Sequence, residues 1–211
     1  RTELSAEPSE CAGLRSAGEI QQSLLNSAKA RGEKLTPAVL AGRVQQVLAV
    51  REIEQTLAAI RTNGGQARYL SVAVDDQAAL ATALDKVRAE LGPIIGLVHA
   101  AGVLADKRIA EKTDEQYARV FDTKVRGLQS LLAATADDPL KLLCVFSSVS
   151  ARCGNTGQAD YAMANEVLNK VAQSQRARRP ELRVKASVGA RVKAAWSTRR
   201  CASALPNWAC R

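Results

Sequence analysis

The sequence predicts an α/β fold built on a parallel sheet with helices on both faces. Short apolar runs alternate with longer segments in which apolar residues recur at helical spacing. One of these runs, Ile94–Ala100, is continuously apolar, which is typical of a strand buried on both faces, and Leu140–Ser147 is predicted to be another buried strand. Apolar residues make up 46% of the 211 residues and aromatic residues only 3%, so we expect a core of Ala, Leu and Val. This composition excludes a disordered chain, a collagen and a dense disulfide scaffold.

The N-terminal third is predicted to be mostly helical. Residues 5–42 are expected to form a surface insertion with helical stretches around Gly18–Ala30 and Pro37–Val44. A further helix, Leu48–Thr62, is expected to end at Asn63-Gly64-Gly65, because asparagine and glycine commonly cap helix C-termini.

The rest of the chain continues the strand and helix alternation. A strand is predicted over Ala67–Val74, and Asp76 and Gly92 bracket a helix that ends at Leu91. Thr113 and Gln116 have the spacing of a capping box, which predicts a helix from there to about Ala136. The remaining predicted elements are the two buried strands above, a helix over Asp160–Arg178 and a strand over Leu182–Ser187.

The net charge of +9 is confined to the C-terminal end. Residues 176–211 hold ten Lys or Arg and one acid, whereas residues 1–175 hold twenty of each. A nucleic-acid-binding face would be spread through the fold, so we expect no nucleic-acid partner; the alternative of a basic nucleic-acid binder rests on this tail alone. The sequence shows no apolar run long enough to span a bilayer and no secretion leader, which predicts a cytoplasmic protein without a membrane partner. Five cysteines without a CxxC pair and a single histidine predict no metal site.

Polar side chains follow two of the predicted strands. The segment HAAG occupies 99–102, and FSSVSA at 146–151 is followed by a helix that carries Tyr161 and Asn165. Tyr161 lies thirteen residues after Ser148 and thirty-seven after Lys124, so these groups can converge at the carboxyl edge of the sheet. Each of them also fits an ordinary role in a turn, in packing or on a solvated face, and the spacing alone leaves both interpretations open.

Four segments resemble the ketoreductase domain of polyketide and polyunsaturated fatty acid synthases, within the short-chain dehydrogenase/reductase superfamily. They read GLVHAAGVLAD, VFDTKVRGL, LKLLCVFSSVSARCGNTGQADYAMANEVLN and LRVKAS, and the likeness runs from about Gln45 to Ala186. The alanine-rich composition and the insertion at residues 5–42 most resemble the polyunsaturated fatty acid synthase branch. No glycine-rich phosphate loop follows any strand here. The resemblance therefore implies a partial Rossmann-like, doubly wound parallel sheet that lacks its first two strands, with a helical insertion near the N-terminus.

The resemblance also implies the catalytic roles. Tyr161 would donate a proton, Ser148 would hydrogen-bond the substrate carbonyl, and Lys124 would supply a charge beside the tyrosine. Asn165 takes the place of the lysine of the YxxxK motif, and in these ketoreductases the lysine comes from the earlier helix, as Lys124 does here. The implied reaction is the NADPH-dependent reduction of a β-ketoacyl thioester, carried on an acyl carrier protein, within a larger synthase whose other domains are partners.

Further positions are assigned by the same resemblance. The residues implied to bind NADPH are Arg1, Val74, Ala100, Ala101 and Gly102. Leu104 and Asp106, in a Leu-Ala-Asp sequence close to the Leu-Asp-Asp of relatives, would control stereochemistry and favour the 3R alcohol. Ala73 departs from the family, which has an aspartate that contacts adenine there. The alternative is a non-catalytic structural half of a split ketoreductase region that binds no cofactor.

The sequence divides into three predicted parts: 1–44, the end of a second strand plus the insertion; 45–187, the ketoreductase core; and 188–211, a basic tail. The sequence of the tail departs from that of the family. This departure predicts a shifted reading frame and a disordered segment; the alternative is a genuine basic C-terminus. Without the first two strands, Ala67–Val74 would have no hydrogen-bonding neighbour and Ile94–Ala100 would present a bare apolar edge. This stretch on its own is therefore expected to be inactive, poorly stable, prone to aggregation and unable to bind NADPH tightly.

Overall fold

The computed structural model describes residues 2–188, which form two compact units that separate between Ser71 and Val72. Arg1, assigned to the cofactor, and nearly all of the basic tail, residues 189–211, lie outside the described residues.

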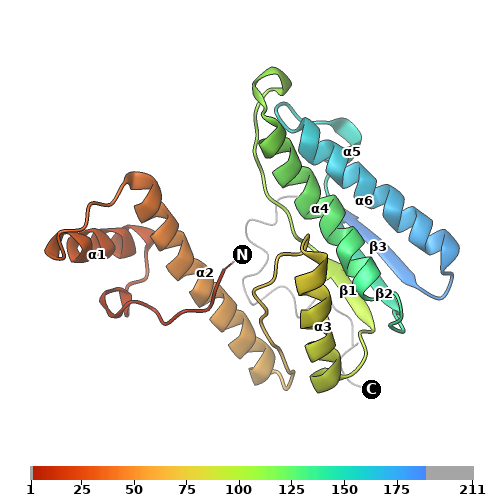
Figure 1. The fold of residues 1–211 in the computed structure, drawn as a ribbon, viewed down its shortest axis with the longest axis horizontal. Helices are drawn as coiled ribbons and strands as arrows, with labels where there is room; N and C mark the ends of the chain where they lie inside the picture. Colours follow the sequence, from red (N-terminus) through yellow and green to blue (C-terminus); the bar gives the residue numbers. More distant parts are fainter. Residues whose placement is uncertain (1, 189–211) are drawn as a thin grey trace. The chain divides into compact units, whose positions relative to one another are not determined.

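The first unit is a pair of helices with a short 3-10 turn. The turn η1 spans Ser9–Cys11, and the helices α1 and α2 span Ala17–Ala30 and Pro37–Thr62 (Figure 1). Ser16 caps α1 through a capping box, and α2 begins at a proline, whose missing N–H costs nothing in the first turn. The core of this unit consists of apolar side chains from all three elements: Cys11, Ile20, Leu24, Leu40, Val44 and Val47.

The helix α2 corrects the sequence prediction of two separate helices, Pro37–Val44 and Leu48–Thr62. It continues through the intervening residues because Val44 and Val47 keep the helical spacing of buried side chains and no glycine or proline interrupts them. The predicted division after residue 44 therefore falls inside a helix. Its C-terminus is as predicted, with Asn63 as the C-cap and Gly64 at a φ of +78°.

The predicted strand Ala67–Val74 is wrong, because these residues form no regular element. A strand requires a hydrogen-bonded neighbour, and apolar composition does not supply one. In the described part of the chain the sheet begins at a later strand, so this segment joins no ladder.

The second unit confirms the predicted α/β class with a parallel sheet. Its strands β1, β2 and β3 span Gly96–His99, Leu142–Ser147 and Arg183–Val188 and lie in that order. The register pairs His99 with Val145 and Val145 with Ala186. The strands are thus close to the predicted runs, although their ends differ by a few residues.

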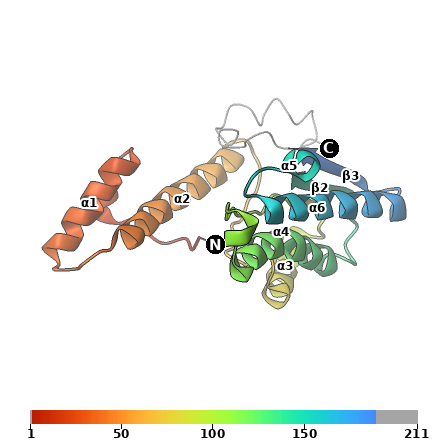
Figure 2. The same ribbon diagram turned by 90° about the horizontal axis from the view of Figure 1, so that it is seen from above.

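Three long helices lie on one face of this sheet (Figures 1 and 2). They are α3, Gln77–Leu91; α4, Asp114–Ala134; and α6, Ala159–Arg178. Both predicted N-terminal signals are confirmed, because the Asp76 side chain caps α3 and Thr113 forms a capping box with Gln116 at α4. Two short elements, η2 (Ile109–Glu111) and α5 (Ser150–Cys153), follow β1 and β2. Helices on the second face, also predicted, are not seen among the described residues of this unit.

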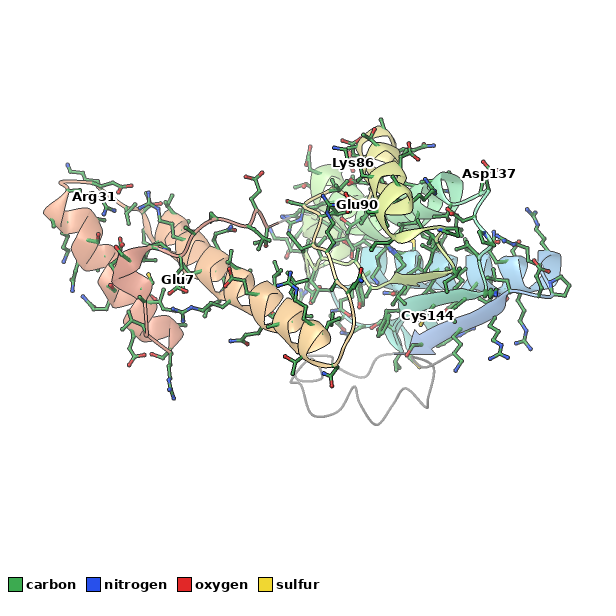
Figure 3. All side chains as sticks on the ribbon, turned by 90° about the horizontal axis from the view of Figure 1, so that it is seen from below. Glu7, Arg31, Lys86, Glu90, Asp137 and Cys144 are labelled. Carbon is green, nitrogen blue, oxygen red and sulfur yellow. The ribbon has the colours of Figure 1, made fainter. Side chains whose placement is uncertain are left out.

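The core of the second unit lies between the sheet and these helices. Leu143 and Val145 point into it and are fully buried, whereas Cys144 alternates to the other face (Figure 3). The other buried members are Leu97, Leu128, Leu140, Leu168, Ala172 and Leu182. At the edge of the sheet, Val98 of β1 remains 62% exposed. No helix in the described residues is long and apolar enough to cross a membrane.

Candidate active site

The candidate site lies at the carboxyl edge of the sheet. The strands are parallel and His99 is paired with Val145, so the residues that follow β1 and β2 emerge at the same edge. The predicted site residues after these strands, Ala100–Gly102 and Ser148, therefore share one end of the unit.

Lys124 comes to this edge from the middle of α4. Its side chain is buried, with only 3% of the residue exposed, and its Nζ donates a hydrogen bond of 3.1 Å to the Phe146 carbonyl. Burial lowers the pKa of the Lys124 ammonium from its ordinary 10.5 to about 8, with no carboxylate contributing to the change. The lysine is therefore still mainly a cation at pH 7, in an environment that does not neutralise it.

The structure brings Lys124 and Tyr161 together. The Lys124 Nζ lies 5.3 Å from the centroid of the Tyr161 ring, within the range of a cation–π contact. Tyr161 is half-buried in the first turn of α6. Ser148 is also half-buried, and its Oγ accepts a hydrogen bond of 3.2 Å from the Ser150 N–H, which orients the hydroxyl in the turn after β2.

Asn165 lies one turn after Tyr161 and is completely buried. Its Nδ2 donates to the Tyr161 carbonyl at 2.7 Å, and its own backbone carbonyl accepts a hydrogen bond of 3.2 Å from the Ser147 hydroxyl. The first bond lies within the helix of the tyrosine, and the second attaches this helix to the end of β2. The Oδ1 of Asn165 is buried without a hydrogen-bond partner among the described residues.

His99 is a site residue to which the sequence pattern assigns no role. It ends β1 with 2% of its surface exposed, and its Nε2 lies 2.9 Å from the Lys124 carbonyl. Burial lowers the pKa of His99, so the ring is neutral at pH 7 and its Nε2–H can donate to that carbonyl. The sequence signal that could have identified His99 is its place as a lone histidine at the end of an apolar run. A buried imidazole at such a position needs a hydrogen-bond partner.

Two glycines bring backbone close to the site. A Cβ on Gly102 would lie 3.0 Å from Cε and 3.3 Å from Nζ of Lys124, so a larger residue would crowd the end of the lysine side chain. A Cβ on Gly127 would lie 2.8 Å from a methyl of Val74 and 3.3 Å from His99. Val74, assigned to the cofactor, thus packs on α4 next to His99.

The residues predicted to control stereochemistry lie in the loop after β1. Leu104 is 54% exposed, and its carbonyl oxygen is 3.5 Å from a guanidinium nitrogen of Arg119. Asp106 is exposed and accepts a hydrogen bond of 2.8 Å from the Gln158 amide, three residues before Tyr161. The loop is therefore attached to the segment that leads into α6.

No group of three or more His, Cys, Asp or Glu side chains arranged for a metal ion occurs among the described residues. The polar groups at this edge are instead a cation, hydroxyls and amides. This set suits hydrogen bonding and proton transfer to an oxygen atom.

Comparison with known proteins gives one consistent result. The family model of the KR domain matches residues 17–189. A polyunsaturated fatty acid synthase polypeptide from Thraustochytrium sp. is 40% identical over 173 residues, which cover 79% of this chain but only 6% of that relative. Among solved structures, an N-terminal ketoreductase from the macrolactin assembly line matches at 29% identity and a TM-score of 0.61, over 64% of this chain and 28% of that one. A ketoreductase domain from the bacillaene assembly line matches at 35% identity and a TM-score of 0.58, over 64% of this chain and 32% of that one.

Proposed function

The chain belongs to the KR family, the ketoreductase domains of polyketide and polyunsaturated fatty acid synthases, and we propose that it reduces a β-ketoacyl thioester to the 3-hydroxyacyl thioester with NADPH. The observation that carries this proposal is the buried Lys124 ammonium, 5.3 Å from the Tyr161 ring at the carboxyl edge of the sheet. The family match extends from residue 17 and therefore includes most of the helical insertion.

The proposed chemistry places negative charge on the carbonyl oxygen of the substrate. NADPH, when bound, supplies the hydride, which no side chain can donate. The Ser148 hydroxyl donates a hydrogen bond to the oxygen as its charge grows, and Tyr161 transfers its phenolic proton to give the alcohol. The phenolate left on Tyr161 needs a neighbouring cation, because the ordinary pKa of tyrosine is about 10. Lys124 is that cation, and it stays charged at pH 7 although burial lowers its pKa.

Asn165 has a supporting role in this proposal. Its hydrogen bond to the Tyr161 carbonyl and the bond from Ser147 to its own carbonyl fix the first turn of α6 relative to β2. Tyr161 and Ser148 then approach the same oxygen from two elements that are directly connected. This arrangement reduces the reorganisation that the reaction requires.

The residues at the edge of the sheet fit the nicotinamide end of the cofactor. Lys124 has three N–H donors, and the Phe146 carbonyl is the acceptor recorded for them among the described residues, which leaves donors for ribose hydroxyls. The backbone after β1 comes close to this ammonium at Gly102, where an added Cβ would lie 3.3 Å from Nζ. We therefore assign Ala100, Ala101 and Gly102, together with Val74, to the cofactor.

An acyl carrier protein that presents the substrate, and further domains of the same polypeptide, are the proposed partners. The relative from Thraustochytrium supports this, because it belongs to a polyunsaturated fatty acid synthase and this chain covers only 6% of its length. The cytoplasm is the proposed location.

The direct test uses the full-length protein that contains this sequence. NADPH oxidation is followed with a β-ketoacyl carrier protein and with a short β-ketoacyl thioester. We expect Tyr161→Phe, which removes the hydroxyl and keeps the ring, to lower turnover roughly 100- to 10,000-fold. Tyr117→Phe is the matched control, because Tyr117 stacks on Phe121 along α4 and is expected to leave turnover unchanged. Equal turnover in the Tyr161→Phe protein and the unmodified protein would contradict the assignment.

The alternative function, a structural half-domain that binds no cofactor, gives a different result in the same experiment. It predicts neither reduction nor NADPH binding by the full-length protein when every other reductase site is inactivated. The buried Lys124 beside Tyr161 favours the catalytic proposal, since burying an ammonium whose charge no carboxylate offsets is costly for a purely structural domain.

A further inference from the structure

A buried ion pair joins the loop after β1 to the beginning of α6. The Nζ of Lys112 lies 2.7 Å from Oδ2 of Asp160 and donates a second bond of 2.7 Å to the Ala105 carbonyl. The side chains of Lys112 and Asp160 are only 5% and 1% exposed. Removing both charges from water is expensive and seldom stabilises a fold more than an apolar pair would, so their positions call for another explanation.

The same carboxylate also contacts the backbone of the proposed proton donor. Oδ1 of Asp160 accepts a hydrogen bond of 2.8 Å from the Tyr161 N–H. One side chain therefore connects two parts: the loop, through Lys112, and the first turn of α6, which carries the phenol. Hydrogen bonds to a charged group of this kind are short and directional, which makes the connection a precise one.

Two further contacts join the same segments. The Lys107 N–H donates to the Gly157 carbonyl at 3.0 Å, and the Asp106 carboxylate accepts from Gln158 at 2.8 Å. The bond between Asp106 and Gln158 lies at the surface, where water competes for it. The buried pair is thus the side-chain contact that, together with the backbone bond between Lys107 and Gly157, fixes the distance between the loop 104–107 and the helix of Tyr161.

We propose that Lys112 and Asp160 are positioning residues that hold the loop 104–107 against α6 and thereby set which face of the substrate carbonyl is reduced. This inference rests on the proposed ketoreductase function. The two faces of a carbonyl differ only in how the substrate is turned beside Tyr161. A loop that lines this position discriminates between them only if its distance from the phenol is fixed.

The test is the double variant Lys112→Met/Asp160→Asn in the full-length protein. Asparagine keeps an oxygen for the Tyr161 N–H, and methionine fills the space of the lysine, so no buried charge is left without a partner. What is lost is the bond to the Ala105 carbonyl and the attraction between the two segments. The matched control is Arg88→Met/Asp138→Asn, which removes another largely buried pair at the opposite edge of the sheet, where Asp138 accepts a hydrogen bond from the Ile94 N–H.

Three quantities are measured on each protein: the ratio of 3R to 3S alcohol, kcat and KM separately, and the exchange rate of the Lys107 amide hydrogen. For Lys112→Met/Asp160→Asn we expect the stereochemical ratio to fall about tenfold or more and kcat to fall more than KM changes, because a misplacement of about 1 Å can cost on the order of 100-fold in rate. The Lys107 amide should exchange faster. The control pair should change none of the three, although both double variants can lower thermal stability.

An unchanged ratio together with an unchanged Lys107 exchange rate would overturn the proposal. If the double variant fails to fold, Asp160→Glu replaces it, since this change keeps the charge and moves the carboxylate by one methylene group. An unaltered ratio of 3R to 3S alcohol in that protein would also overturn the proposal. Lack of reduction by the unmodified protein would refute the proposed function instead, and the exchange of the Lys107 amide would then decide whether the pair holds the loop.

Discussion

Replacing Lys124 by methionine should stabilise this domain while it abolishes reduction. Burial lowers the pKa of the Lys124 ammonium from 10.5 to about 8, and a difference of this size corresponds to about 3 kcal/mol of disfavoured charge in the folded state at about 1.4 kcal/mol per pK unit. Methionine has a similar volume and no charge. The lost hydrogen bond to the Phe146 carbonyl opposes the gain by about 1 kcal/mol, so we expect the variant to be more stable by about 2 kcal/mol at pH 7.

The pH dependence of this difference follows from the direction of the pKa change. Because the folded state holds the Lys124 proton less tightly than the unfolded chain does, the penalty is fully present below pH 8. It disappears as the pH rises from about 8 to 10.5, where both states lose the proton. The stability of the unmodified protein should therefore rise relative to the variant across this window, and the difference between them should change by about 3 kcal/mol.

Urea titration with pulse proteolysis measures this stability difference in the full-length protein, and the α6 peptide serves as the reporter for this domain. Lys86→Met, at an exposed lysine of α3 (Figure 3), is the control and should shift the urea midpoint little at either pH. The reasoning is refuted if Lys124→Met is less stable than the unmodified protein at pH 7, or if the difference is the same at pH 7 and pH 10.

Three further predictions concern packing, pH and product. Gly127→Ala would place a Cβ 2.8 Å from a methyl of Val74 and should cost roughly 1–3 kcal/mol in unfolding free energy. Gly42→Ala, in an open position of α2, should instead stabilise the protein by about 0.5–1 kcal/mol. Urea midpoints that move in the same direction in both variants would contradict this expectation. Because burial lowers the pKa of His99, the unfolded chain takes up the proton first, so stability should be constant above the ordinary pKa of 6.5 and decrease as the pH falls below it, an effect that His99→Gln should remove. Chiral chromatography should find mainly the 3R alcohol, increased by Ala105→Asp, and a predominantly 3S product would reverse the assignment of the loop.

Local signals in the sequence predicted those parts of the fold that depend on neighbouring residues. The capping box of Thr113 and Gln116 and the glycine after Asn63 mark helix ends correctly, because capping involves residues within one turn. The two mainly apolar runs locate β1 and β2, although in the described residues the side chains of β1 alternate between buried and exposed positions.

Features that depend on distant partners could not be predicted in this way. The segment Ala67–Val74 has the composition of a strand, but a ladder also needs an adjacent strand. Lys112 and Asp160 are forty-eight residues apart, and a charged residue in a loop and another at a helix start normally indicate solvated positions. The place of Lys124 beside Tyr161 was predicted only through the family resemblance, because spacing alone does not fix which face of α4 meets the sheet.

Lys124 is attached at both of its ends, since its backbone carbonyl meets the ring of His99 and its ammonium meets the carbonyl of Phe146. A free lysine side chain loses about 1.5–2 kcal/mol of rotamer entropy when it is immobilised. Here that loss belongs to folding, so the arrival of a substrate restricts no further motion of this side chain.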